Sequence, residues 1–244
     1  MFKKLLALVL VVFFTQVIHA AENLYEKHYK EQNDRGLKSL KVDPDTKLYV
    51  SNHSDVDNIS MLESGYDMMG STGFEAGSIT PDMALQHAKS IEADVVLVYS
   101  KYAAKESPLS KLEAIKEAAK TTGEVDPELL EEAEEQYKYY ASYWAKMPMP
   151  LLGLHVIKLK RKSNEDESAI AEEGLKVLAV IKDSPAFEAG LLRGDVLLRL
   201  GNVNLQRPEA LSTAVRKYQG KKVEIAYERN HVSASTLATI NTIK

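Results

Sequence analysis

Residues with the right chemistry for catalysis are few in this chain and lie far apart. A serine protease needs a serine in a glycine-rich turn, together with a histidine and an aspartate that activate it. The nearest motif is G-S-T-G at residues 70–73, and beyond the apolar N-terminal segment only His28 and His53 precede it. The residues before this motif are too few for the two β-barrels of a trypsin-like protease, so the sequence argues against that class of enzyme.

Metal and phosphate chemistry find no support either. The chain has no cysteine, no H-E-x-x-H motif, and no G-K-[ST] after the glycine-bearing residues 70–77. The other histidines of the mature chain are scattered, at His87, His155 and His231. We expect no metal site, no cofactor and no catalytic residue, and therefore no enzyme. An enzyme with an unrecognised site in the N-terminal half, around residues 65–77 and Asp94, remains an alternative.

The charge balance narrows the class of partner. The formal net charge is -4, and removing Lys3 and Lys4 with a leader would make it -4 - 2 = -6. A mildly acidic chain without a basic block is a poor ligand for nucleic acid or for an anionic membrane. We expect neither as a partner.

The first 21 residues have the pattern of a secretory signal peptide. Lys3 and Lys4 are followed by an apolar run at residues 5–14 and by the small residues Ala20 and Ala21. The apolar run is short for a membrane anchor, which is the alternative reading. We expect cleavage after Ala20 or Ala21, export to a bacterial periplasm, and no stable membrane insertion afterwards.

The most specific pattern in the chain is S-P-A-F-E-A-G-L-L-R-G-D-V-L-L at residues 184–198. Ser184, or Asp183 before it, can cap a short helix, and Pro185 suits the first turn of that helix. The two glycines suit turns because glycine takes positive φ without a steric penalty. The pattern therefore predicts a helix of barely two turns, a glycine turn and a strand at residues 196–200.

This pattern resembles the central signature of bacterial-type PDZ domains, S-P-A-x-x-A-G-L-x-x-G-D-V-L, and the resemblance covers residues 150–244. PDZ domains are peptide-binding modules attached to many envelope proteases. The resemblance implies a PDZ-like β-barrel or sandwich with two helices. It also implies that a peptide adds as a strand to an open sheet edge beside a helix.

The resemblance further implies where a peptide binds. L-L-G-L at residues 151–154 matches the loop whose backbone amides cradle a terminal carboxylate. Residues 154–159 are the expected receiving strand, and residues 208–218 the expected flanking helix. The expected peptide-binding residues are Leu152, Gly153, Leu154, His155, Val156, Leu211 and Val215. His155 is out of phase with the apolar wall, and we expect it on a solvated or outer sheet face.

Residues 22–147 are expected to form a small α/β sheet domain, which makes the whole chain α+β. The expected elements are a short helix or loose lead-in at residues 22–44, strands at residues 47–51, 65–70 and 95–99, a helix beginning at T-P-D, residues 80–82, a loop or cap at residues 52–60 and a loop at residues 71–77. Residues 107–135 read as a helical insertion, with one helix at residues 110–119 and a second beginning at residue 126. This insertion is either a solvated surface segment or a partner-binding arm.

The tyrosine-rich residues 136–147 favour a strand that pairs with residues 95–102. Pro148 and Pro150 end that element, so the predicted domain boundary lies there. The leading hypothesis is a periplasmic adaptor or sensor in protein quality control or secretion, which binds extended or C-terminal segments of partner proteins. The alternative is a structural protein whose groove holds its own chain or mediates a homodimer.

Overall fold

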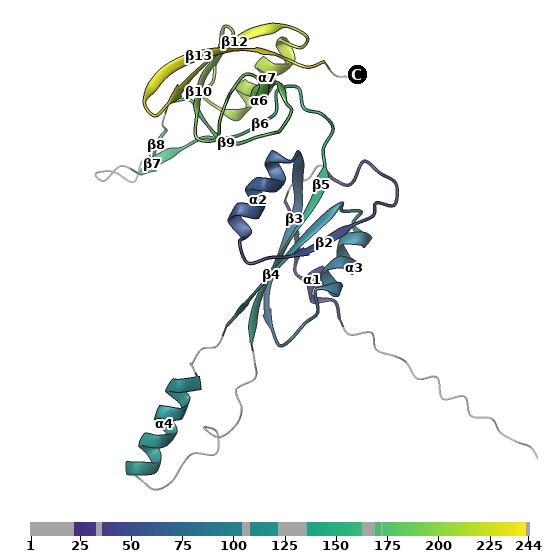
Figure 1. The fold of residues 1–244 in the computed structure, drawn as a ribbon, viewed down its shortest axis with the longest axis vertical. Helices are drawn as coiled ribbons and strands as arrows, with labels where there is room; N and C mark the ends of the chain where they lie inside the picture. The colour runs from purple at the N-terminus through teal and green to yellow at the C-terminus, as the bar shows by residue number, and fades with distance from the viewer. Residues whose placement is uncertain are drawn as a thin grey trace, which may run out of the picture.

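The computed structural model describes residues 22–32, 36–103, 108–121, 136–162, 169–171 and 173–242. The signal-peptide prediction and the predicted second helix of the insertion lie outside these residues. Two larger sheets, one built from residues 29–146 and one from residues 154–239, are connected by residues 147–153 (Figure 1). Among the described residues, no helix is long and apolar enough to cross a membrane.

The first sheet has the strand order β1-β3-β5-β4-β2. Its strands are β1 (Tyr29–Glu31), β2 (Lys47–Val50), β3 (Tyr66–Ala76), β4 (Val95–Tyr102) and β5 (Tyr137–Lys146). β5 pairs antiparallel with both β3 and β4, whereas β2 runs parallel to β4. The predicted pairing of the tyrosine-rich strand with residues 95–102 is therefore confirmed.

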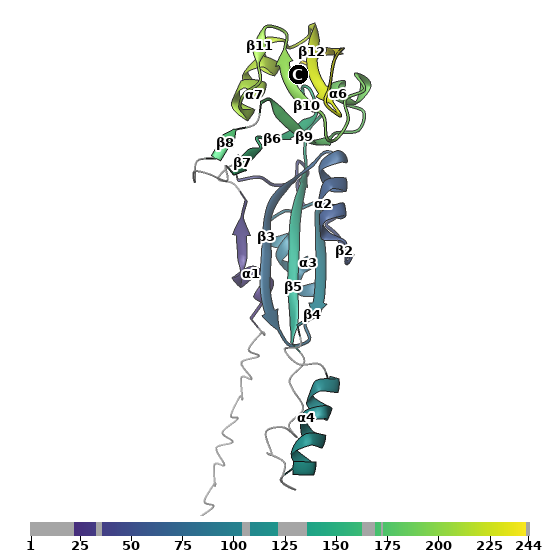
Figure 2. The same cartoon turned by 90° about the vertical axis from the view of Figure 1, so that its left-hand side faces the viewer.

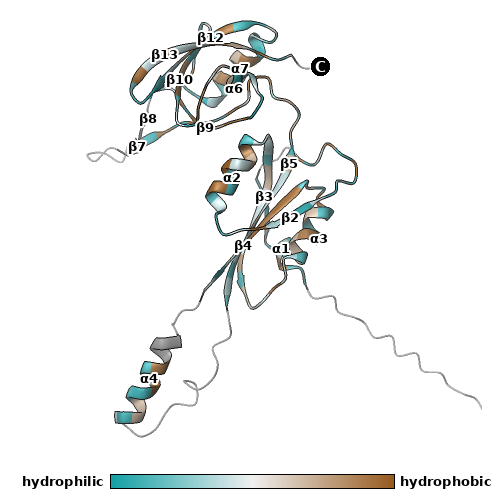
Figure 3. Ribbon diagram, viewed as in Figure 1, coloured by the Kyte–Doolittle hydropathy of each residue, from teal (hydrophilic) through white to brown (hydrophobic). Residues whose placement is uncertain are grey.

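Helices cover both faces of this sheet (Figures 1 and 2). They are α1 (Leu24–Lys27), α2 (Ser54–Glu63) and α3 (Asp82–Ser90). Tyr25 of α1 and Ala84 of α3 share a core with Tyr143 of β5, while Leu62 of α2 packs against Trp144 on the opposite face. Alternate residues of β5 thus contribute to two separate cores. The hydrophobic colour in Figure 3 is strong on the neighbouring β4, with its run of valines and leucine, whereas the tyrosine-rich β5 is paler.

Two segments differ from their predictions. Residues 52–60, expected as a loop or cap, belong largely to α2, where Asp55 and Asp57 in the first turn interact favourably with the helix dipole. Residues 71–76, expected as a loop, continue β3, because they pair with residues 137–142 of β5. Gly70, just before them, marks a close approach rather than a turn, since a Cβ there would lie 2.5 Å from the Tyr29 ring.

The insertion follows β4 and begins with α4 (Pro108–Thr121), which matches the predicted first helix. Figures 1 and 2 show α4 beyond the end of the β4–β5 pair, away from the rest of the first sheet.

The second sheet has the order β13-β12-β10-β9-β6, with β11 paired to β10. Its strands are β6 (Leu154–Ile157), β9 (Leu175–Val180), β10 (Val196–Leu200), β11 (Val203–Asn204), β12 (Lys222–Arg229) and β13 (Val232–Thr239). A separate hairpin, β7 (Lys160–Lys162) with β8 (Ala169–Ala171), lies within the charged segment after β6. The helices α6 (Pro185–Glu188) and α7 (Pro208–Lys217) complete this part of the chain, and its sheet is sandwich-like rather than a closed barrel.

The signature residues 184–198 fold as predicted, except that α6 has a single turn. The Ser184 side chain accepts a hydrogen bond from the Phe187 N–H and so caps α6. α6 stays short because a turn centred on Gly190, at φ +75°, redirects the chain immediately after it. Leu191 and Leu197 on either side of this turn are then buried in the common core.

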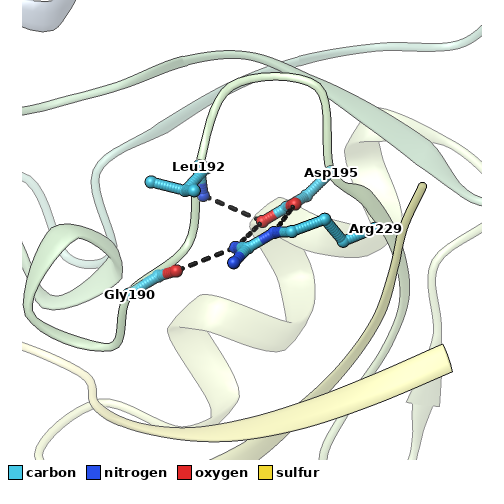
Figure 4. A network of polar contacts seen from close by, with 4 residues as sticks. All are labelled: Gly190, Leu192, Asp195 and Arg229. Atoms are coloured by element: carbon cyan, nitrogen blue, oxygen red, sulfur yellow. Dashed lines mark hydrogen bonds and ion pairs between the residues drawn. The ribbon is translucent and has the colours of Figure 1, made fainter. Parts of the chain in front are cut away.

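A buried carboxylate holds the end of the signature in place (Figure 4). Asp195 is 1% exposed and forms a two-point ion pair with Arg229 of β12, at 2.7 and 2.8 Å. The same carboxylate accepts the Leu192 N–H, and Arg229 also donates to the Gly190 carbonyl. A single ion pair therefore fixes the glycine turn and the start of β10.

We expect Asp195→Ala to lower the free energy of unfolding by about 3 kcal/mol, because Arg229 and the Leu192 amide lose their acceptor. Glu224→Ala is the matched control. It removes a carboxylate from the exposed Arg199–Glu224 pair, so we expect a loss of about 1 kcal/mol or less. Urea unfolding of both variants measures the difference. Equal losses would contradict the role given to Asp195.

Candidate functional site

β6 lies at the edge of the second sheet and pairs on one side only, with β9. Leu154 lies opposite Val180, and the Ile181 N–H donates to the Gly153 carbonyl at 3.0 Å. In an antiparallel pair this places Leu154 at a non-hydrogen-bonded position, so its N–H and C=O point away from β9. The sheet therefore presents unpaired backbone groups at this edge, as strand addition requires.

The loop before β6 has its carbonyl groups fixed by three different parts of the fold. The Leu151 carbonyl accepts the Asn241 N–H at 2.9 Å, and the Leu152 carbonyl accepts the Ala186 N–H of α6 at 2.9 Å. The Gly153 carbonyl accepts the Ile181 N–H. Three successive carbonyls are thus held by groups from the rest of the domain.

This arrangement determines where the loop amides point. In a trans peptide unit the carbonyl of one residue and the N–H of the next point in opposite directions. The N–H groups of Leu152, Gly153 and Leu154 are therefore directed away from the groups that hold the carbonyls. Within the described part of the chain, the Leu152 and Gly153 amides have no hydrogen-bond partner although both residues are buried. Successive unpaired amides form a site for an anion.

Gly153 cannot be replaced without moving this loop. Its φ is +88°, and a Cβ at this position would lie 2.2 Å from the Ser184 Cβ and 2.3 Å from its Oγ. The loop thus approaches the cap of α6 at a distance that only glycine allows. The glycine pattern in the sequence identified this position, whereas the contact with Ser184 required the structure.

We expect Gly153→Ala to destabilise the protein by about 3 kcal/mol or more, because a strained φ is combined with a steric clash. Gly190→Ala is the matched control. Gly190 also has positive φ, but a Cβ there meets nothing within 4 Å, so we expect a loss of about 1–2 kcal/mol. Thermal or urea unfolding of the two variants tests this order. A smaller loss for Gly153→Ala would contradict the close packing of the loop.

The predicted apolar wall is brought together by the fold. Leu152, Leu211 and Val215 are buried in one cluster, and Leu154 and Val156 pack against it while remaining partly accessible. Leu211 and Val215 of α7 are therefore core residues of the same cluster against which Leu154 and Val156 of β6 pack. A ligand lying along β6 would thus meet Leu154 and Val156 first.

His155 differs from the other predicted site residues, because it is not part of this cluster. Burial lowers the pKa of His155, and the carboxylate of Asp67 in β3 partly opposes that effect. The charge of Asp67 in the first sheet therefore affects the protonation of His155. The helix α2, which packs against the first sheet, ends nearby: the Lys182 N–H, just after β9, donates to the Glu63 carbonyl at 2.8 Å.

A lowered pKa makes stability depend on pH with a definite sign. The unfolded chain protonates His155 near its ordinary pKa of about 6.5, whereas the folded chain resists protonation. Stability is therefore lost as the pH falls from about 7 towards 5. We expect His155→Gln to weaken this loss without removing it, since burial also lowers the pKa of His87. Urea unfolding at pH 7, 6 and 5 measures the slopes, and parallel curves for the two proteins would refute the prediction.

Cavities outside the groove offer less chemistry. One of about 780 Å³ lies beside the first sheet, where residues 38–46 meet Lys89 and Glu92. Asp94, the residue around which an unrecognised enzyme site was considered, accepts hydrogen bonds from the Ser39 hydroxyl and the Lys146 N–H. Among the described residues, no group of three or more histidines and carboxylates is placed to hold a metal ion.

The comparison with known families agrees with this geometry. Residues 150–239 match the family model of the PDZ domain. This part of the chain is a PDZ domain. The family predicted from the signature is therefore confirmed over these residues, which contain the edge strand, the loop and α7.

Individual proteins resemble only part of the chain. A stretch of 63 residues is 38% identical to the zinc metalloprotease RasP of Shouchella clausii, which covers 26% of this chain and 15% of RasP. The chain thus spans a small fraction of the length of that relative.

Three solved structures resemble part of the chain. The HtrA-type protease AlgW with a decapeptide has a TM-score of 0.32 at 27% identity, over 37% of this chain and 28% of AlgW. The HtrA3 PDZ domain bound to a phage-derived ligand has a TM-score of 0.29 at 21% identity, over 37% and 81% of the two chains. The PDZ domain of EpsC from Vibrio cholerae has a TM-score of 0.27 at 18% identity, over 54% and 97%.

Proposed function

We propose that this protein binds the C-terminal segments of partner proteins in the groove between β6 and α7 of its PDZ domain. The observation that supports the proposal is the direction of the N–H groups of Leu152, Gly153 and Leu154. These groups point away from the residues that bind the preceding loop carbonyls. A terminal carboxylate is the acceptor that satisfies such amides, and hydrogen bonds to a charged acceptor are the stronger kind.

The remainder of the ligand would add to β6 as an antiparallel strand. The outward N–H and C=O of Leu154 supply main-chain hydrogen bonds, and the apolar wall favours a hydrophobic terminal side chain. Main-chain pairing is independent of sequence, so selectivity would come from the residues that contact Leu154 and Val156.

We further propose that the protein is not an enzyme and works in the periplasm as an adaptor or sensor of other envelope proteins. The binding module and the signal-peptide pattern of the first 21 residues support this role. In this reading the similarity to RasP and AlgW reflects a shared PDZ module, and the partners are peptide segments rather than nucleic acid or membrane.

The test uses the protein from residue 22 to residue 244 and a panel of hexapeptides that differ only in the last residue. Each peptide is prepared as a free acid and as a C-terminal amide. We expect the best free acid to bind with a Kd in the micromolar range, about -8 kcal/mol. The amide form should bind at least about tenfold more weakly, because it lacks the charged acceptor. Fluorescence polarisation or calorimetry measures both constants.

Two neighbouring substitutions on β6 serve as variant and control. Val156→Asp places a charge in the groove and should abolish binding, whereas Ile157→Asp, at an exposed position outside the apolar cluster, should leave it nearly unchanged. If no peptide binds and the molecular mass rises with concentration, the proposal fails and a self-associating protein becomes the better description.

A further inference from the structure

Asn241 lies beyond the segment that matches the PDZ family and yet contacts the carboxylate loop. Its side-chain Nδ2 donates to the Pro150 carbonyl at 2.9 Å, and its main-chain N–H donates to the Leu151 carbonyl at 2.9 Å. One residue near the C-terminus therefore holds the first two carbonyls of the loop. Asn241 and Pro150 lie 91 positions apart in the sequence.

The residue before Asn241 is firmly anchored. Ile240 is 1% exposed in the PDZ core, its N–H donates to the Lys221 carbonyl at 3.0 Å, and its carbonyl accepts the Gly220 N–H at 2.9 Å. Asn241 is thus presented to the loop by the end of the β12–β13 pair.

The donors that bind the loop carbonyls belong to different segments of the chain. The Leu152 and Gly153 carbonyls are held by Ala186 and Ile181, which belong to the signature region and to the end of β9. The entry to the loop, at Pro150 and Leu151, is held by Asn241. Because peptide planes are rigid, fixing the Leu151 carbonyl fixes the direction of the Leu152 N–H, the first amide of the anion site.

We propose that Asn241 is a positioning residue that presets the loop for a free carboxylate, so that selection of chain termini depends on the segment after β13. The proposal rests on the function proposed above. Asn241 touches no ligand in this arrangement, because both of its hydrogen bonds go to loop carbonyls. Its contribution is to order the loop before the ligand binds, so that the free energy of binding is not reduced by the cost of ordering the loop.

Two substitutions test the proposal by the ratio of free-acid to amide affinity for the best peptide of the panel. Asn241→Ala keeps the main-chain N–H and removes the Nδ2 donor, so we expect this ratio to fall about threefold to tenfold. Asn241→Asp keeps the shape but replaces the donor with a negative charge beside the loop, so we expect a larger fall.

Asn202→Ala is the matched control. The Asn202 side chain accepts hydrogen bonds from Lys217 and Tyr218, and none of its contacts involves the loop. We expect this variant to lose some stability while its acid-to-amide ratio stays at the wild-type value. If the role of Asn241 were purely structural, Asn241→Ala would lower the melting temperature of the protein without changing that ratio.

A second readout follows the loop in the absence of ligand. Amide hydrogen exchange at Ile181 and Ala186, whose N–H groups donate to the loop carbonyls, should become faster in Asn241→Ala relative to the amides of β12, as measured by NMR. Wild-type protein that binds no peptide would overturn the proposed function together with this inference. Wild-type binding with an unchanged ratio and unchanged exchange in Asn241→Ala would overturn the inference alone.

Discussion

The planarity of the trans peptide unit is the constraint on which the groove of this protein depends. Once the carbonyls of Leu151, Leu152 and Gly153 are bound from within the domain, the amides that follow them must point the other way. Under the proposed function, a carboxylate bound at these amides would need no dedicated cationic side chain. Its binding site consists of main-chain groups whose direction the surrounding fold has already determined.

The signature supports this loop from two sides. The first turn of α6 supplies the Ala186 N–H, and its cap Ser184 lies so close to Gly153 that a side chain is excluded there. The ion pair of Asp195 with Arg229 then fixes the turn that follows α6. The residues that make the signature specific thus hold the loop at residues 151–154 in place.

The first sheet meets the PDZ domain next to the same loop. Ile181 holds the Gly153 carbonyl, and the adjacent Lys182 binds the end of α2 at Glu63. The Met147 N–H also donates to the Gly65 carbonyl, which ties the connecting segment to the first sheet. Two neighbouring residues just after β9 therefore contact the loop and the end of α2.

Local patterns determined much of this structure. Glycine, proline and a capping serine at fixed spacing specify α6 and β10, because each acts through its own backbone preferences. The alternating tyrosines of β5 specify a strand with two buried faces. The five apolar residues predicted for the groove were found in one cluster, since period-two geometry and helical spacing describe them.

Other features depend on contacts between distant residues, and no local pattern reveals them. Residues 54–60 form a helix whose end, at Met61 and Leu62, packs against the first sheet. Residues 71–76 remain in a strand because they pair with β5, which lies more than 60 residues further along the chain. The partners of the loop carbonyls, Asn241 above all, lie far away in the chain. The sequence by itself indicated a PDZ domain from residue 150 onward, and the family model matches residues 150–239 of that segment. Only the tertiary structure decided which groups orient its amides, because hydrogen bonds between distant segments form only once the chain has folded.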